Sequence, residues 1–190
     1  MKRTYRHFST AIITYRAVAL VAIVSLGVML SGARPFAQGA TLKGDFLKEW
    51  AGQKDTLMKI AEAMPENKYS FKPTPAQRDF GGHVMHIAQI NLMVFKMLGA
   101  KAPAPAINEK AATKAEMIKA MADSFDYGTA ILNEQTDQSM AASIQGPPWM
   151  GPSTRARIFA FMIGHTQDTY GQMVVYLRLN GGVPPASARP

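Results

Sequence analysis

Four segments of the chain carry apolar residues at steps of three and four, the spacing that places them on one face of a helix. The first segment lies within residues 44–64, and Pro65 ends it. The second begins after Asp79, whose carboxylate can accept hydrogen bonds from the free amides of a first helical turn, and Gly99 ends it. Helices of this length are marginal alone, so we expect their apolar faces to pack together.

The third and fourth segments have start signals of their own. Thr113-Lys-Ala-Glu116 has the form of a capping box, and Ser153 or Thr154 can cap the last helix. A glycine- and proline-rich run that follows Asn180 ends that helix. The segment from residue 137 to 152 is expected to be a loop, and no segment reads as a convincing strand.

These elements predict an all-α protein, an up-down four-helix bundle that spans residues 44–187. The bundle follows an N-terminal leader over residues 1–37. Residues 1–16 carry four basic side chains and no acidic one, and an unbroken apolar run of 14 residues, Ala17–Leu30, comes next. Small residues then offer cleavage sites near Ala33 or Ala37.

This order of charge, apolar run and small residues is typical of a secretory signal peptide. We therefore expect an exported protein, periplasmic or secreted. Fourteen apolar residues are fewer than the roughly 20 that cross a bilayer. The protein would contact a membrane only if the leader stayed uncleaved.

The net charge of +8 belongs mainly to the leader. Five of the 21 Lys and Arg residues lie within residues 1–37, which leaves 16 basic against 13 acidic residues, or +3, in the rest of the chain. The remaining lysines form no basic stripe, so we expect no nucleic-acid partner. The chain has no cysteine, which excludes disulfides, thiolate metal sites and a cysteine nucleophile.

Polar residues stand on helix faces that should be buried, where an unpaired polar group costs a few kcal/mol. All three histidines after the leader are among them. Imidazoles on facing helices can share a divalent cation, but each can also be a core residue that donates to a carbonyl. The predicted inward polar residues are Gln53, His83, His86, His165, Thr169 and Gln172.

Several motifs in this order resemble the DinB-like (YfiT-type) family of metal-dependent four-helix bundles. The resemblance covers most of residues 44–187. The motifs are Tyr69-Ser-Phe-Lys-Pro-Thr-Pro75, Phe80-Gly-Gly-His-Val-Met-His-Ile-Ala88, Gly164-His-Thr-Gln-Asp-Thr-Tyr-Gly-Gln172 and Tyr176-Leu-Arg-Leu-Asn-Gly-Gly-Val-Pro-Pro-Ala-Ser187.

The resemblance implies a nickel or zinc site made by one histidine on the second helix and a His-x-x-x-His pair on the fourth. His86 and His165 match two of these ligands, whereas Thr169 stands where the third histidine is expected. A hydroxyl is a poor ligand for nickel or zinc, so the triad is incomplete. His83, one turn before His86, or Asp168 could take the third position.

Two functions follow from this pattern, and the sequence leaves both open. The first is a divalent-metal-binding bundle related to thiol transferases or metal-dependent hydrolases, with His86, His165 and His83 as metal ligands. The second is a metal-free, non-catalytic bundle whose polar seam binds a small ligand or serves only structure. Whether the protein is an enzyme stays undecided. The partner is an unidentified small molecule, and relatives of this kind suggest a homodimer.

Overall fold

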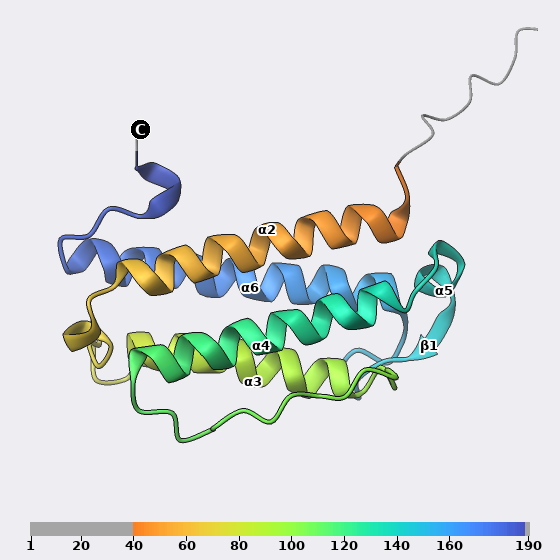
Figure 1. The fold of residues 1–190 in the computed structure, drawn as a ribbon, viewed down its shortest axis with the longest axis horizontal. Coiled ribbons are helices and arrows are strands. Elements are labelled where there is room, and N and C mark those ends of the chain that lie inside the picture. The colour runs from red at the N-terminus through yellow and green to blue at the C-terminus, as the bar shows by residue number, and fades with distance from the viewer. Residues whose placement is uncertain (1–39, 189–190) are drawn as a thin grey trace, which may run out of the picture. The chain divides into compact units, whose positions relative to one another are not determined.

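The computed structural model describes residues 40–188, so the predicted signal peptide lies outside the described residues. Four long helices make up most of this part of the chain (Figure 1). They are α2 (Leu42–Ala63), α3 (Phe80–Lys96), α4 (Lys114–Asn133) and α6 (Arg155–Leu179). The all-α bundle predicted from the sequence is confirmed.

The helices begin where their capping residues predict. The Asp79 side chain accepts from the Gly82 amide at 2.6 Å and opens α3. Thr113 and Glu116 form both hydrogen bonds of the capping box that opens α4. Thr154, rather than Ser153, caps α6, because its side chain accepts from the Arg157 amide. Local sequence therefore sets these three starts.

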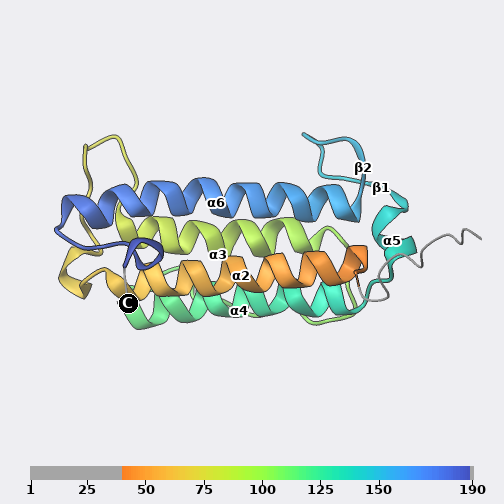
Figure 2. The same cartoon turned by 90° about the horizontal axis from the view of Figure 1, so that it is seen from above.

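The bundle has an up-down-down-up order. Each of α2 and α3 packs against both α4 and α6, so α2 lies diagonally across from α3 (Figures 1 and 2). The Tyr176 hydroxyl near the end of α6 donates to the Arg78 carbonyl just before α3, which fixes these two helices as antiparallel neighbours. This α3–α6 seam holds the histidines.

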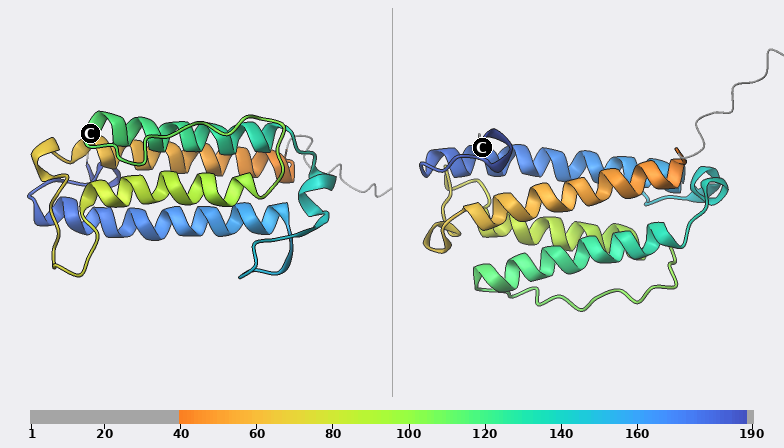
Figure 3. Two further views of the ribbon diagram at one scale, coloured as in Figure 1. Left: turned by 90° about the horizontal axis from the view of Figure 1, so that it is seen from below. Right: turned by 45° about the horizontal axis from the view of Figure 1, so that its top comes forward.

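A long segment, residues 97–113, returns along the bundle so that α3 and α4 run in the same direction (Figure 3). This segment is anchored near its start. The Glu134 carboxylate beyond α4 accepts from the Lys101 and Ala102 amides, at 3.0 and 2.7 Å. We call residues 97–113 the crossing segment.

The stretch from residue 137 to 152 is more ordered than the predicted loop. A short helix, α5 (Asp137–Ala141), is capped by Thr136 and is followed by two three-residue strands, β1 (Ser143–Gln145) and β2 (Pro152–Thr154). These strands pair in antiparallel register, with Ile144 opposite Ser153. The prediction was wrong here because strands of three residues are too short for an alternating pattern to stand out.

Two 3-10 turns complete the described chain: η1 (Glu66–Lys68) and η2 (Pro185–Ser187). The core centres on Trp50, which is fully buried and whose indole donates to the Phe125 carbonyl at 2.9 Å. Among residues 40–188, no helix combines the length and the apolar character needed to cross a membrane.

Candidate functional site: a histidine pair on the α3–α6 seam

His86 on α3 and His165 on α6 face each other across the seam. Their Nε2 atoms lie 3.2 Å apart, and both side chains are partly buried. Each residue stands at the edge of its helix's buried face, since the neighbours Ile87 and Thr166 are fully buried. The two imidazoles therefore meet where the interior borders on solvent.

The surroundings favour neutral imidazoles. Burial, the largest cause, together with the positive charge of Arg78 and the adjacent His165 and His83, lowers the pKa of His86 to about 4. Burial also lowers the pKa of His165, although the Asp168 carboxylate opposes this change. A neutral imidazole has a free lone pair on one nitrogen, which is the form that binds metal ions.

His83 lies one helical turn before His86 and is only 2% exposed. Neither of its ring nitrogens has a hydrogen-bond partner among the described residues. Its ring meets the Tyr176 ring edge-on, with centroids 5.0 Å apart. Burial, the largest cause, together with the Arg78 charge lowers its pKa, so it too is neutral near pH 7.

Thr169 lies one turn after His165, as the family pattern requires of the third ligand. Its side chain is buried, and its hydroxyl donates to the His165 carbonyl at 3.0 Å. No group of three His, Cys, Asp or Glu side chains within residues 40–188 is placed to hold one metal ion. The structure thus brings together two imidazoles.

Two of the polar residues predicted to point inward do otherwise. Gln172 is exposed, and its amide donates to the Asp168 carboxylate on the surface of α6. Gln53 is half-buried and donates to Glu49 on its own helix. Asp168 is likewise exposed, and its carboxylate is the acceptor of the hydrogen bond from Gln172. Its position on the surface of α6 is therefore accounted for without a metal ion.

An aromatic pair beside the histidines was not foreseen as part of the site. Trp149, between the two strands, lies with its ring centroid 4.7 Å from that of Phe161 on α6. The Phe161 ring in turn lies nearly parallel to the His165 ring, with centroids 6.5 Å apart. Trp149 is 56% and Phe161 40% exposed. Phe161 stands four residues before His165, on the same face of the helix. This spacing was the sequence signal that could have placed Phe161 in the site.

The seam combines two close, neutral imidazoles with exposed aromatic rings next to them. Imidazole pairs of this kind can share a divalent cation or share a proton in a direct hydrogen bond. The neighbouring rings offer an apolar surface to whatever approaches the pair.

Comparison with known proteins agrees with this architecture. The model of the DinB family matches residues 38–189. A crystal structure of a DinB-like protein from Bacillus cereus aligns with a TM-score of 0.60 at 20% identity, over 74% of this chain and 93% of that one. A DinB-like protein from Bacillus subtilis aligns with a TM-score of 0.59 at 17% identity, over 76% and 99%.

No curated protein sequence matches the chain. At these identities the two solved structures are evidence for the fold alone. The family model, however, spans most of the chain, all four long helices included. The protein therefore belongs to the DinB family.

Proposed function

We propose that this protein binds a divalent metal ion, zinc or nickel, between His86 and His165. The observation that carries the proposal is the separation of 3.2 Å between their Nε2 atoms. Two imidazoles that bind one zinc ion at about 2.0–2.1 Å with tetrahedral angles have nitrogen atoms about 3.3–3.4 Å apart. The pair thus has the spacing that one shared ion requires.

The lowered pKa values support the same proposal. Both imidazoles are neutral at physiological pH, so a metal ion need not displace a proton from either ring. A divalent ion held here would polarise a bound water or substrate atom and so supply Lewis-acid chemistry. The residues of this chain would hold the ion through two nitrogens and leave its remaining positions to solvent or ligand.

The site is weaker than a three-histidine site would be. Structural zinc sites with four protein ligands bind with about 10–16 kcal/mol, or about 3 kcal/mol per ligand, so each ligand contributes roughly 100-fold in affinity. The Thr169 hydroxyl already donates to a backbone carbonyl and replaces an imidazole poorly. This loss favours the second function, a metal-free bundle in which the two histidines share one hydrogen bond.

The test is a zinc and nickel titration of chelator-treated protein by isothermal calorimetry. The proposal expects one ion per chain, with binding weakened about 100-fold in His165→Ala. Thr169→His should tighten binding about 100-fold. Gln167→His is the matched control, because it adds an imidazole to the exposed side of the same helix and should change nothing.

Absence of binding by the parent protein, with tight binding by Thr169→His, would contradict the proposal and establish the metal-free function. Circular dichroism should show that each variant keeps its helices.

Export of the protein is a separate proposal that rests on the order of residues in the leader. Mass spectrometry of the protein from its native host tests it, with a new N-terminus near residue 34 or 38 expected.

A further inference from the structure

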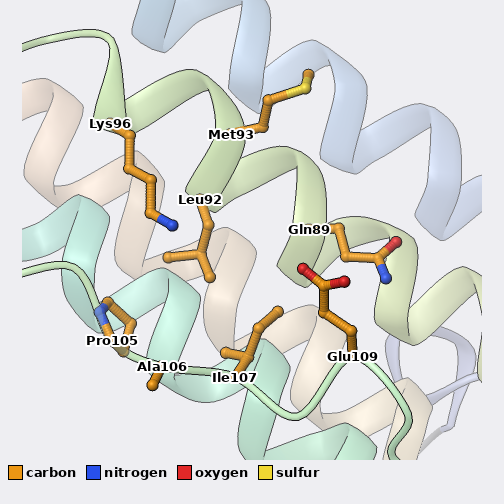
Figure 4. Close-up of a pocket in the computed structure, with 8 residues that line it drawn as sticks. All are labelled: Gln89, Leu92, Met93, Lys96, Pro105, Ala106, Ile107 and Glu109. Atoms are coloured by element: carbon orange, nitrogen blue, oxygen red, sulfur yellow. The ribbon is translucent and has the colours of Figure 1, made fainter.

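A groove with a volume of about 470 Å³ lies between α3 and the crossing segment (Figure 4). None of the residues that line it belongs to the histidine site. Leu92 and Ile107 form its apolar part, together with Pro105. The volume falls within the range of about 300–1,000 Å³ that small-molecule sites occupy.

Three polar side chains border the groove and are left without a partner. Gln89 and Lys96 come from α3, and Glu109 comes from the crossing segment. All three are exposed, and none of their side chains forms a hydrogen bond or ion pair with any residue from 40 to 188. The groove therefore offers one free cation, one free anion and one free amide.

These groups lie at opposite ends. In Figure 4 the Glu109 carboxylate faces Gln89, whereas Lys96 is at the far end, with Leu92 and Ile107 between them. Lys96 follows Gln89 by seven positions along α3, which corresponds to about 10 Å along the axis. A ligand that reaches from Lys96 to Gln89 must span about this axial distance, with an anionic group at Lys96 and a cationic group at Glu109.

The wall formed by the crossing segment has free backbone groups. Pro103 and Pro105 restrain the residues before them to extended conformations. Within the described residues, the amides of Ala104, Ala106 and Ile107 take part in no hydrogen bond. An extended stretch of backbone with free amides can pair with the backbone of an extended peptide.

We propose that this groove binds a short zwitterionic peptide of about three residues with an apolar central side chain. Three extended residues span about 10 Å, which matches the axial separation of Gln89 and Lys96 on α3. The peptide carboxylate contacts Lys96, its ammonium group contacts Glu109 and the Gln89 carbonyl, and its side chain packs on Leu92 and Ile107. The proposal is independent of metal binding at the seam.

Calorimetric titration of the purified chain with the tripeptide Ala-Leu-Ala tests the proposal. We expect saturable binding that weakens about two- to fivefold when either terminus is capped, the range for exposed ion pairs. Amidation of the C-terminus should have no further effect in Lys96→Met, and acetylation of the N-terminus none in Glu109→Gln. Lys48→Met and Glu62→Gln change exposed charges on α2 and should behave like the parent.

Three results would overturn the proposal: no saturation up to about 10 mM peptide, equal binding of the free and the doubly capped peptide, or capping effects that persist in Lys96→Met and Glu109→Gln. Free leucine separates a peptide site from an amino-acid site. Its charges are too close together to reach both ends, so leucine that binds as tightly as Ala-Leu-Ala would also overturn the proposal.

Discussion

Trp50 and His83 both have buried rings that contain nitrogen, but the two rings differ in their hydrogen bonds. The Trp50 indole donates to the Phe125 carbonyl, and its ring packs against Phe95 and Phe159 at centroid distances of 5.2 and 6.1 Å. His83 has no hydrogen bond to either nitrogen within the described residues. We call the surroundings of Trp50 the aromatic core, and the region of His83, His86 and His165 the histidine seam.

The difference separates stability from binding. A buried polar group without a partner costs about 1–3 kcal/mol, whereas a satisfied one is close to neutral. The aromatic core has no such cost at Trp50, but the histidine seam leaves three ring nitrogens without a partner among residues 40–188: both of His83 and Nδ1 of His165. The aromatic core therefore stabilises the fold without this cost, whereas the histidine seam carries it.

The largest effect should come from removal of the central ring of the aromatic core. Trp50→Ala leaves a cavity among four helices and should lower the free energy of unfolding by about 3–5 kcal/mol. Urea denaturation followed by circular dichroism measures it. Trp149→Ala is the matched control, because Trp149 is 56% exposed and should cost less than about 0.5 kcal/mol. Equal costs at both positions would contradict the distinction.

A smaller effect is expected where α4 approaches the same ring. A Cβ atom at Gly128 would lie 2.7 Å from Phe95 and 2.8 Å from Trp50. Gly128→Ala should therefore lower the free energy of unfolding by about 1–3 kcal/mol. Gly52→Ala, on α2 with open space around it, should raise it by about 0.5–1 kcal/mol. Stabilisation by both variants would show that this close approach is unimportant.

In the histidine seam, removal of a buried ring should change the free energy of unfolding in the opposite direction. His83→Leu replaces an unsatisfied imidazole with an apolar side chain of similar size, so the free energy of unfolding should rise by about 1 kcal/mol. Zinc affinity, from calorimetry on the same variant, should stay within about twofold, because the described structure pairs only His86 with His165. A loss of roughly 100-fold would instead make His83 the missing third ligand.

In the absence of metal, the free energy of unfolding should also depend on pH. In the unfolded chain His86 takes up a proton below about pH 6.5, whereas in the folded chain it does so only near pH 4. The unfolded state therefore binds more protons between these values, and the free energy of unfolding should fall as the pH falls from 6.5 towards 4. Urea denaturation at several pH values, with chelator present, should show a flatter decline in His86→Gln. An unchanged slope would mean that His86 titrates normally in the fold.

The sequence predicted most of the architecture because its signals are local. The capping interactions of Asp79 and Thr113, and the proline after α2, act within a few residues, so they can be read without tertiary contacts. The short helix and the paired strands between α4 and α6 were missed, because three-residue strands depend on each other rather than on their own pattern.

The candidate site was predicted less completely, and α6 shows why. A strict alternation of three- and four-residue steps drifts by about 20° per heptad relative to a helix of 3.6 residues per turn. Over the 25 residues of α6 this drift carries Gln172 to the surface while Thr169 and Tyr176 stay buried. His86 and His165 face each other because of the way α3 and α6 pack. The residue pattern of a single helix carries no information about that packing.

One measurement tests the central claim most directly: a double-mutant cycle of zinc affinity with His86→Ala, His165→Ala and the double variant, by competition with a chromogenic chelator. If the two imidazoles hold one ion, each single variant should lose about 100-fold in affinity at an unchanged limit of one ion per chain. Two results would contradict a shared ion on the histidine seam. In the first, each single variant keeps tight binding at reduced stoichiometry, as independent sites would. In the second, none of the three variants changes the affinity.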